Sequence, residues 1–149
     1  MIQRKQSVYL LLAVIAIVCA LCLPIGYFVD EAASLVFKPM GVTLKDGGQL
    51  STWGLFALLV LGAIIPACTI FLFRNRRLQM RMTLFHILLL VGYYFVLLFF
   101  CSVLKKDLNS TFQFNWAICL PMVAIILDWL AFGAIRHDDE MVKAVDRLR

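Results

Sequence analysis

The sequence predicts an all-α membrane protein with four antiparallel transmembrane helices, in a single domain that covers residues 1–149. Hydrophobic residues make up 63% of the chain and charged residues 15%, with a mean hydropathy of +0.93. A soluble domain is nearer to half apolar and a quarter charged. The apolar excess lies in four runs, each with the roughly 20 residues that a helix needs to cross about 30 Å of hydrocarbon. The runs cover residues 8–27, 52–73, 82–104 and 116–135.

The first run follows Arg4 and Lys5, as the apolar core of a signal peptide would. It is longer than such a core, and no small-x-small cleavage site follows it, so we expect a retained membrane helix. Residues 28–50 then alternate short apolar runs with Pro39 and with glycines. This pattern predicts a small extracytoplasmic cap that is either a short β-hairpin or irregular. The cap either shields the helix ends or binds a partner.

The second run opens at Thr52 and Trp53, and a tryptophan is a typical anchor at a membrane interface. Pro66 lies inside this run, where we expect a kink that neighbouring helices tolerate. The third run is the bulkiest and has few small residues, so we expect it to supply much of the lipid-facing wall. Residues 105–115 predict a short, polar outer loop.

The distribution of basic residues predicts the orientation in the membrane. Ten of the 14 Lys and Arg residues lie at the N-terminus, in the second loop and in the tail. The bias of Lys and Arg toward cytoplasmic segments therefore places both termini and the second loop in the cytoplasm. This topology explains the net charge of +5 better than a nucleic-acid partner does. The arginines of the second loop either only set the topology or also bind anionic lipid headgroups; they are Arg74, Arg76, Arg77 and Arg81.

The fourth run has one small or polar face and one bulky face. Small residues let helices approach closely in lipid, so we expect the small face to pack against the other helices and the bulky face to meet lipid. The predicted packing face comprises Ala117, Pro121, Ala124, Asp128, Ala131 and Ile135. The predicted lipid face comprises Ile118, Met122, Ile125, Trp129 and Phe132.

Asp128 lies in the middle of this packing face, close to the midplane of the predicted membrane. A charged Asp there costs about 2.5–3.5 kcal/mol, so it must be paired, protonated or hydrated. His86 is the best candidate partner, because the helical rise places it in the same half of the bilayer. Thr69, Tyr93 and Tyr94 are alternative partners. The pair is either a polar contact that holds helices together or a site for a proton or cation.

The tail, residues 136–149, has a helical pattern with one apolar stripe. The tail either continues the fourth helix or lies on the membrane surface, and in both cases it offers a cytoplasmic docking face. The stripe comprises Met141, Val142, Val145 and Leu148.

The sequence contains no catalytic motif, no metal-binding constellation and no cofactor motif. Cys19 and Cys22 form a C-x-x-C pair, which some four-helix membrane redox enzymes use. Here the pair lies in an apolar helix without a nearby cation to lower a thiol pKa, so the cysteines are expected to act as small hydrophobic residues.

Three stretches together resemble a family of small four-helix inner-membrane proteins of Gram-negative bacteria, known as a domain of unknown function. The stretches are MIQRKQSVYLLLA at residues 1–13, FLFRNRRLQM at residues 71–80, and the tail with AIRHDDE at residues 134–140 followed by DRLR at 146–149. The resemblance implies a location in the bacterial inner membrane. It implies no activity, ligand or cofactor, but it makes the two cytoplasmic motifs family features, consistent with a cytoplasmic partner.

The sequence favours a non-enzymatic scaffold or accessory subunit whose partners are the bilayer and a protein or a second copy of the chain. The first alternative is a small oligomeric transporter or channel that uses Asp128. The second is a membrane thiol-redox enzyme that uses Cys19 and Cys22.

Overall fold

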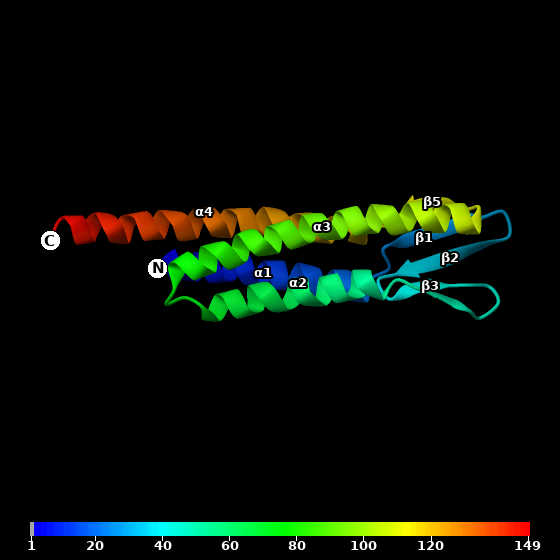
Figure 1. Cartoon of the computed structure of the whole chain (residues 1–149), viewed down its shortest axis with the longest axis horizontal. Coiled ribbons are helices and arrows are strands. Elements are labelled where there is room, and N and C mark those ends of the chain that lie inside the picture. Colours follow the sequence, from blue (N-terminus) through cyan, green and yellow to red (C-terminus); the bar gives the residue numbers. More distant parts are fainter. Residues whose placement is uncertain (1) are drawn as a thin grey trace.

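The computed structural model describes residues 2–149, with side-chain exposure from Arg4 onward. The chain forms long helices and a small antiparallel sheet (Figure 1). In order, the elements are α1 (Ile2–Cys22), β1 (Gly26–Asp30), β2 (Ala33–Lys38), β3 (Gly41–Thr43), β4 (Gln49–Ser51), α2 (Trp53–Phe71), α3 (Arg76–Leu108), β5 (Thr111–Phe114), the short 3-10 helix η1 (Trp116–Cys119) and α4 (Leu120–Arg147).

Within residues 2–149, four helices are long and apolar enough to cross a membrane. They form an up-and-down bundle in which α1 packs against α2 and α4, and α3 packs against the same two helices. Figure 1 shows α1 and α3 running toward the sheet, while α2 and α4 run away from it. Both chain ends and the α2–α3 turn therefore lie at the end of the bundle opposite the sheet.

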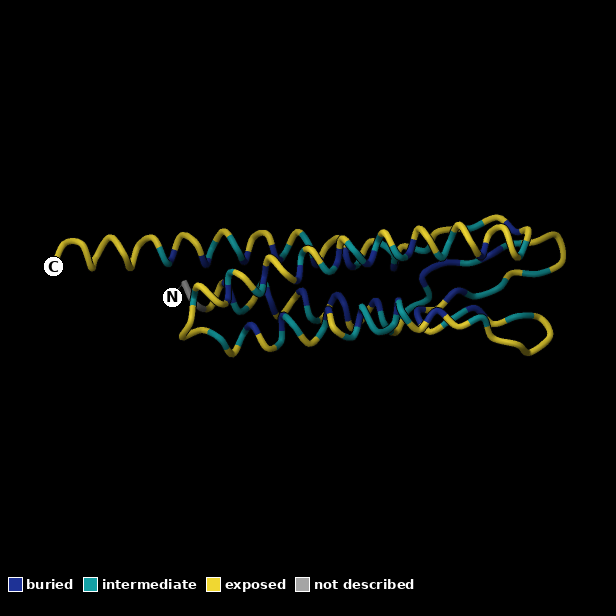
Figure 2. The backbone as a smooth tube through the Cα atoms, in the orientation of Figure 1, coloured by how far each residue is buried: buried dark blue, intermediate teal, exposed yellow. Residues whose placement is uncertain are grey.

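The outer surface of the bundle is apolar. Large hydrophobic side chains such as Leu88, Phe95, Phe99 and Trp129 are more than three-fifths exposed. Soluble monomers rarely expose apolar patches larger than a few hundred Å². Figure 2 shows that the buried residues instead form a narrow strip between the helices. Length, composition and surface are thus all those of a bundle suited to lipid.

The buried face of α4 confirms the predicted packing face. All six predicted residues, from Ala117 in η1 to Ile135, are buried, and Ala124, Asp128 and Ala131 have no exposed surface. The predicted lipid face is only partly correct. Met122 and Trp129 are more than half exposed, but Ile118, Ile125 and Phe132 are partly buried, and the two isoleucines pack against the core. The repeat of small residues thus decides which side of α4 meets the bundle, because only small side chains allow this close approach.

The sheet is larger than the predicted hairpin. In the described part of the chain it has five strands in the order β4-β3-β2-β1-β5, all paired antiparallel. The rings of Phe28, Phe37 and Phe112 cluster on it with centroids 4.9–6.1 Å apart. Strand β5 lies in the stretch predicted as a polar loop. It forms because it pairs with β1, which lies more than 80 residues away in sequence.

Several element ends also differ from the predicted runs. Helix α1 ends at Cys22, before Pro24, and the chain enters β1 at Gly26. Helix α3 has 33 residues, about 50 Å, and extends the predicted run 82–104 by more than one turn at its first end. Arg76, Arg77 and Arg81 therefore lie on a helix instead of in a loop. Helix α4 runs unbroken to Arg147, so the tail continues it.

Candidate functional site

The structure brings His86 and Asp128 together in the interior of the bundle. His86 lies on α3 and Asp128 on α4, and the imidazole Nδ1 is 2.6 Å from the carboxylate Oδ2. The two side chains are 1% and 0% exposed. A contact this short between buried polar groups is a direct tie between the two helices.

The local sequence of α4 makes this contact possible. Ala124 and Ala131 lie one turn before and one turn after Asp128 on the same face, and both are fully buried. Their methyl side chains let α4 come close to its neighbours, so the short Asp side chain spans the remaining gap to His86.

The pair has few other polar neighbours. In the described chain, the 2.6 Å approach of His86 Nδ1 to Asp128 Oδ2 is the one polar contact of either side chain. Proton positions on an imidazole follow its partners, so the distance is the decisive feature. Each residue is therefore the principal partner of the other, and loss of either leaves a buried polar group unsatisfied.

Helix α2 approaches the histidine at a glycine. A Cβ atom on Gly62 would lie 3.6 Å from His86 Nε2, so an imidazole edge packs against the bare backbone of α2. Pro66, one turn later, has no N–H and cannot bond the Gly62 carbonyl. The polar pair thus lies beside the point where the hydrogen-bond ladder of α2 is interrupted.

Further buried polar groups extend from the pair toward the end of the bundle that carries the termini. Gln79 and Thr83 precede His86 on the same face of α3. The Thr83 hydroxyl donates to the Gln79 carbonyl at 2.9 Å, and the Gln79 amide donates to the Thr69 carbonyl of α2 at 3.4 Å. This half of the interior is therefore more polar than the half near the sheet, where Leu90 and Leu97 fill the same face.

At that end, an arginine clamps the α2–α3 turn to α4. The Nη1 atom of Arg76 lies 3.2 Å from both the backbone oxygen and the carboxylate Oδ2 of Asp138. Asp138 belongs to the same face of α4 as Asp128, and it is buried. The polar pair and the clamp thus tie α3 to α4 at two levels.

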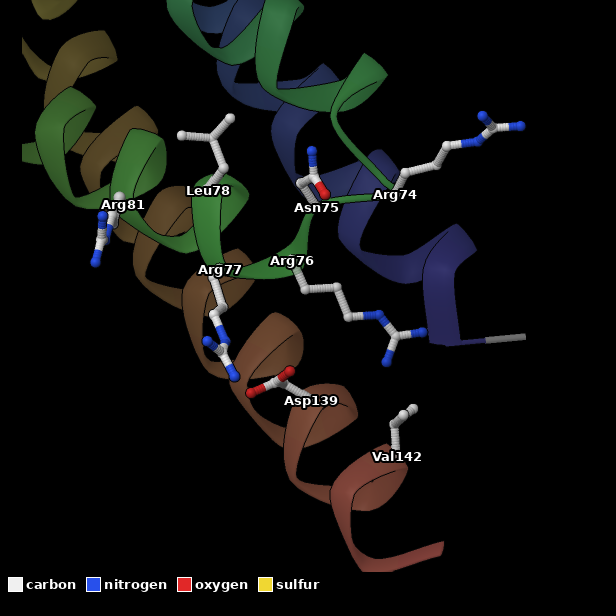
Figure 3. Close-up of a pocket in the computed structure, with 8 residues that line it drawn as sticks. All are labelled: Arg74, Asn75, Arg76, Arg77, Leu78, Arg81, Asp139 and Val142. Carbon is white, nitrogen blue, oxygen red and sulfur yellow. The ribbon is translucent and has the colours of Figure 1, made fainter. Parts of the chain in front are cut away.

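The clamp borders an open cavity of about 730 Å³ between the α2–α3 turn and α4 (Figure 3). Four of its lining residues are arginines, and one is a carboxylate, Asp139. The four predicted arginines of the second loop therefore share one site. The remaining lining residues are Asn75, Leu78 and Val142.

Beyond Asp138, helix α4 projects past the bundle. Figure 2 shows this extension as exposed from Glu140 onward. The predicted stripe of Met141, Val142, Val145 and Leu148 is exposed, and none of these side chains is less than two-fifths accessible. On the polar side of the extension, Lys143 Nζ lies 2.5 Å from Asp139 Oδ2. That hydrogen bond, and secondarily the nearby arginines, lower the pKa of Asp139 below its ordinary value.

The cysteines and the metal-binding residue types form no comparable cluster. Cys19 and Cys22 are both free thiols on the exposed surface of α1. Among residues 2–149, no three His, Cys, Asp or Glu residues gather as a metal site would require.

A comparison with known families matches this sequence to one of them. The profile described as "Domain of unknown function (DUF4293)" matches residues 2–148. The chain belongs to the DUF4293 family. No curated protein matches the sequence. In this DUF4293 chain the matched region therefore includes the His86–Asp128 pair, the arginine cavity and almost all of the α4 extension.

In this DUF4293 protein, the buried polar residues Gln79, Thr83 and Asp138 were not predicted from the sequence. A signal for them was present: residues 79, 83 and 86 follow one face of α3, and residues 128, 131, 135 and 138 follow one face of α4. The helical repeat that identified Asp128 would also have identified Asp138. It was missed because the predicted span ended at residue 135.

Proposed function

We propose that this chain is an integral protein of the bacterial inner membrane that acts as a non-enzymatic scaffold or accessory subunit. Helix α1 has 21 residues, so it is about 32 Å long and fits a hydrocarbon layer of about 30 Å. The exposed apolar belt supports insertion, and the Lys and Arg bias places both termini and the α2–α3 turn in the cytoplasm. The sheet then lies on the opposite side.

A reporter fusion tests this orientation. Alkaline phosphatase inserted between Gly47 and Gly48 should be active, because it folds only outside the cytoplasm, and the same enzyme fused after Arg149 should be inactive. The β3–β4 connection is a suitable site because a Cβ atom at Gly47 would meet nothing within 4 Å. The reverse pattern of activity would overturn the orientation.

The scaffold role is supported above all by the α4 extension. The face of α4 that packs into the bundle continues past the end of the bundle through Val142 and Val145. There the face is exposed, because no other described part of the chain covers it. From Asp138 to Arg147 the helix rises by about 14 Å. An apolar stripe on an isolated helix is a typical helix-in-groove recognition element. We infer a cytoplasmic protein partner or a second copy of the chain.

Cross-linking in native membranes, followed by purification and mass spectrometry, tests this role. The wild-type chain should retain one stable partner, or itself, and a Val142→Ser/Val145→Ser variant should lose it. Arg147→Ser is the control, because Arg147 is also exposed but lies on the opposite side of the helix from Val142 and Val145. Equal recovery with both variants would argue against docking through the stripe.

A small oligomeric transporter that uses Asp128 is the second candidate. The observation that favours it is the buried His86–Asp128 pair, with polar groups leading from it toward the proposed cytoplasmic end. Against it, the same face of α3 continues as Leu90, Tyr93 and Leu97, all buried, toward the sheet. Substitution of Asp128, developed in the Discussion, separates the two candidates.

A further inference from the structure

The cavity at the α2–α3 turn contains more arginines than are needed to link this turn to α4, because Arg76 alone makes that link. It presents four arginines against one carboxylate. Arg76 is already engaged by Asp138, and its side chain is only 24% exposed. Asp139 is already engaged by Lys143. In the described chain, Arg74, Arg77 and Arg81 form no ion pair, so three cationic groups around the cavity remain available.

We propose that this cavity binds the phosphodiester headgroup of an anionic phospholipid. The inference rests on the proposed membrane insertion, which puts the α2–α3 turn at the level of the headgroups of the cytoplasmic leaflet. Arg76 holds the turn against α4, so the cavity wall is anchored before a ligand arrives. Figure 3 shows the Arg77 side chain directed toward Asp139, with Arg81 to one side of it and Arg74 extending away on the other side.

The chemistry of the lining selects a phosphate ester. Guanidinium groups bind phosphate oxygens through paired, charge-assisted hydrogen bonds, and they do so more specifically than a lysine ammonium does. Leu78 and Val142, each about two-fifths exposed, add apolar surface for the glycerol and the first acyl carbons. A zwitterionic headgroup would bring its own ammonium group toward the arginines, so a headgroup with a net negative charge is favoured.

The test compares two lipids and three proteins. The full-length chain, purified in detergent, is titrated with phosphatidylglycerol or phosphatidylcholine, and native mass spectrometry measures the bound lipid. We expect the wild type to prefer phosphatidylglycerol. In Arg77→Gln/Arg81→Gln the affinity for phosphatidylglycerol should fall about 25-fold, at about fivefold for each charge near the surface. Circular dichroism checks that this variant is folded; if it is not, Arg81→Gln alone should give about fivefold.

Arg136→Gln is the matched control. It removes one arginine charge at the same end of the bundle, as the single variant Arg81→Gln does, but Arg136 is not among the described residues that line the cavity. Arg136 instead pairs with Glu140 at 3.1 Å and is 67% exposed. We expect this variant to bind phosphatidylglycerol as the wild type does. An equal loss of affinity in the control and the cavity variant would overturn the assignment, because general surface charge would then explain the binding.

Three other outcomes would also overturn the proposal. No preference between the two lipids would exclude an anionic headgroup site. Full displacement of phosphatidylglycerol by inorganic phosphate would show that the ligand is a soluble phosphate. Failure of the wild type to float with phosphatidylcholine vesicles would defeat the proposed membrane insertion itself. A chain that floats with those vesicles but shows no lipid preference would leave the proposed function intact and remove only this inference.

Discussion

Replacement of Asp128 by Asn should leave the protein folded and functional, whereas replacement by Leu should weaken the bundle. Asn has nearly the size of Asp and supplies both a donor and an acceptor to His86. Leu supplies neither, so the imidazole loses the partner that lies 2.6 Å from its Nδ1. The difference between the two variants therefore isolates the polar contact between α3 and α4.

The expected magnitudes distinguish a hydrogen-bonded pair from a pair of buried charges. A hydrogen bond between membrane helices contributes about 0.6–2 kcal/mol, so Asp128→Leu should lose about that much and Asp128→Asn less than about 1 kcal/mol. Removal of one partner from a buried ion pair costs about 3–5 kcal/mol, because the other charge is left without a counterion. With side chains 1% and 0% exposed, water has little access to repair either loss.

Unfolding in mixed micelles, followed by circular dichroism, measures these free energies. A double-mutant cycle with His86→Leu and Asp128→Leu removes the effect of side-chain size, because the double variant retains neither polar group. We expect a favourable coupling energy of about 0.6–2 kcal/mol. A loss of 3 kcal/mol or more for Asp128→Asn would refute the hydrogen-bond reasoning.

The same variant separates the two proposed functions. In a deletion strain, Asp128→Asn should complement like the wild type if the pair only holds helices together, because Asn keeps the contact. Asn cannot exchange a proton, so a transporter that uses Asp128 would be folded but inactive. A well-folded, inactive Asn variant would therefore reject the scaffold and support transport.

Three further predictions concern packing, the sheet and the tail. Ala124→Leu should destabilise the bundle by about 1–3 kcal/mol in the same unfolding assay, since Ala124 is fully buried, whereas Met122→Leu on the exposed face should have little effect; equal tolerance would contradict the assigned face. Gly26→Ala should speed hydrogen exchange in β5, because the new Cβ would lie 2.6 Å from a β5 backbone oxygen; unchanged exchange would show that the edge strand shifts freely. Lys143→Gln should raise the pKa of Asp139 toward its ordinary value in a carboxyl NMR titration, because the hydrogen bond from Lys143 is the main cause of the lowered value. A lowered pKa stabilises the fold above the unfolded-state pKa, and this contribution disappears as the pH falls through the folded-state pKa; an unchanged pKa in the variant would assign the shift to the arginines.

The sequence by itself determined the number of long apolar helices and the packing face of α4. Both follow from local rules: a run of about 20 apolar residues is a property of consecutive positions, and the alternation of small and bulky residues follows the helical repeat. The position of Asp128 among small residues was visible for the same reason. The pairing of short strands in residues 28–50 was visible only as a hairpin, since the short stretch around residue 112 does not indicate which strand it pairs with.

The tertiary structure decided which distant residues meet. Strand β5 exists because β1 offers it hydrogen-bond partners; its four residues, TFQF, suit a strand but are too few to predict one without a partner. The separation of 2.6 Å between His86 and Asp128 depends on how closely α3 and α4 approach, which many buried contacts set together. The arginine cavity likewise needs both the early start of α3 and the unbroken extension of α4. Each is a relation between segments far apart in the chain, and a local pattern carries no information about such distances.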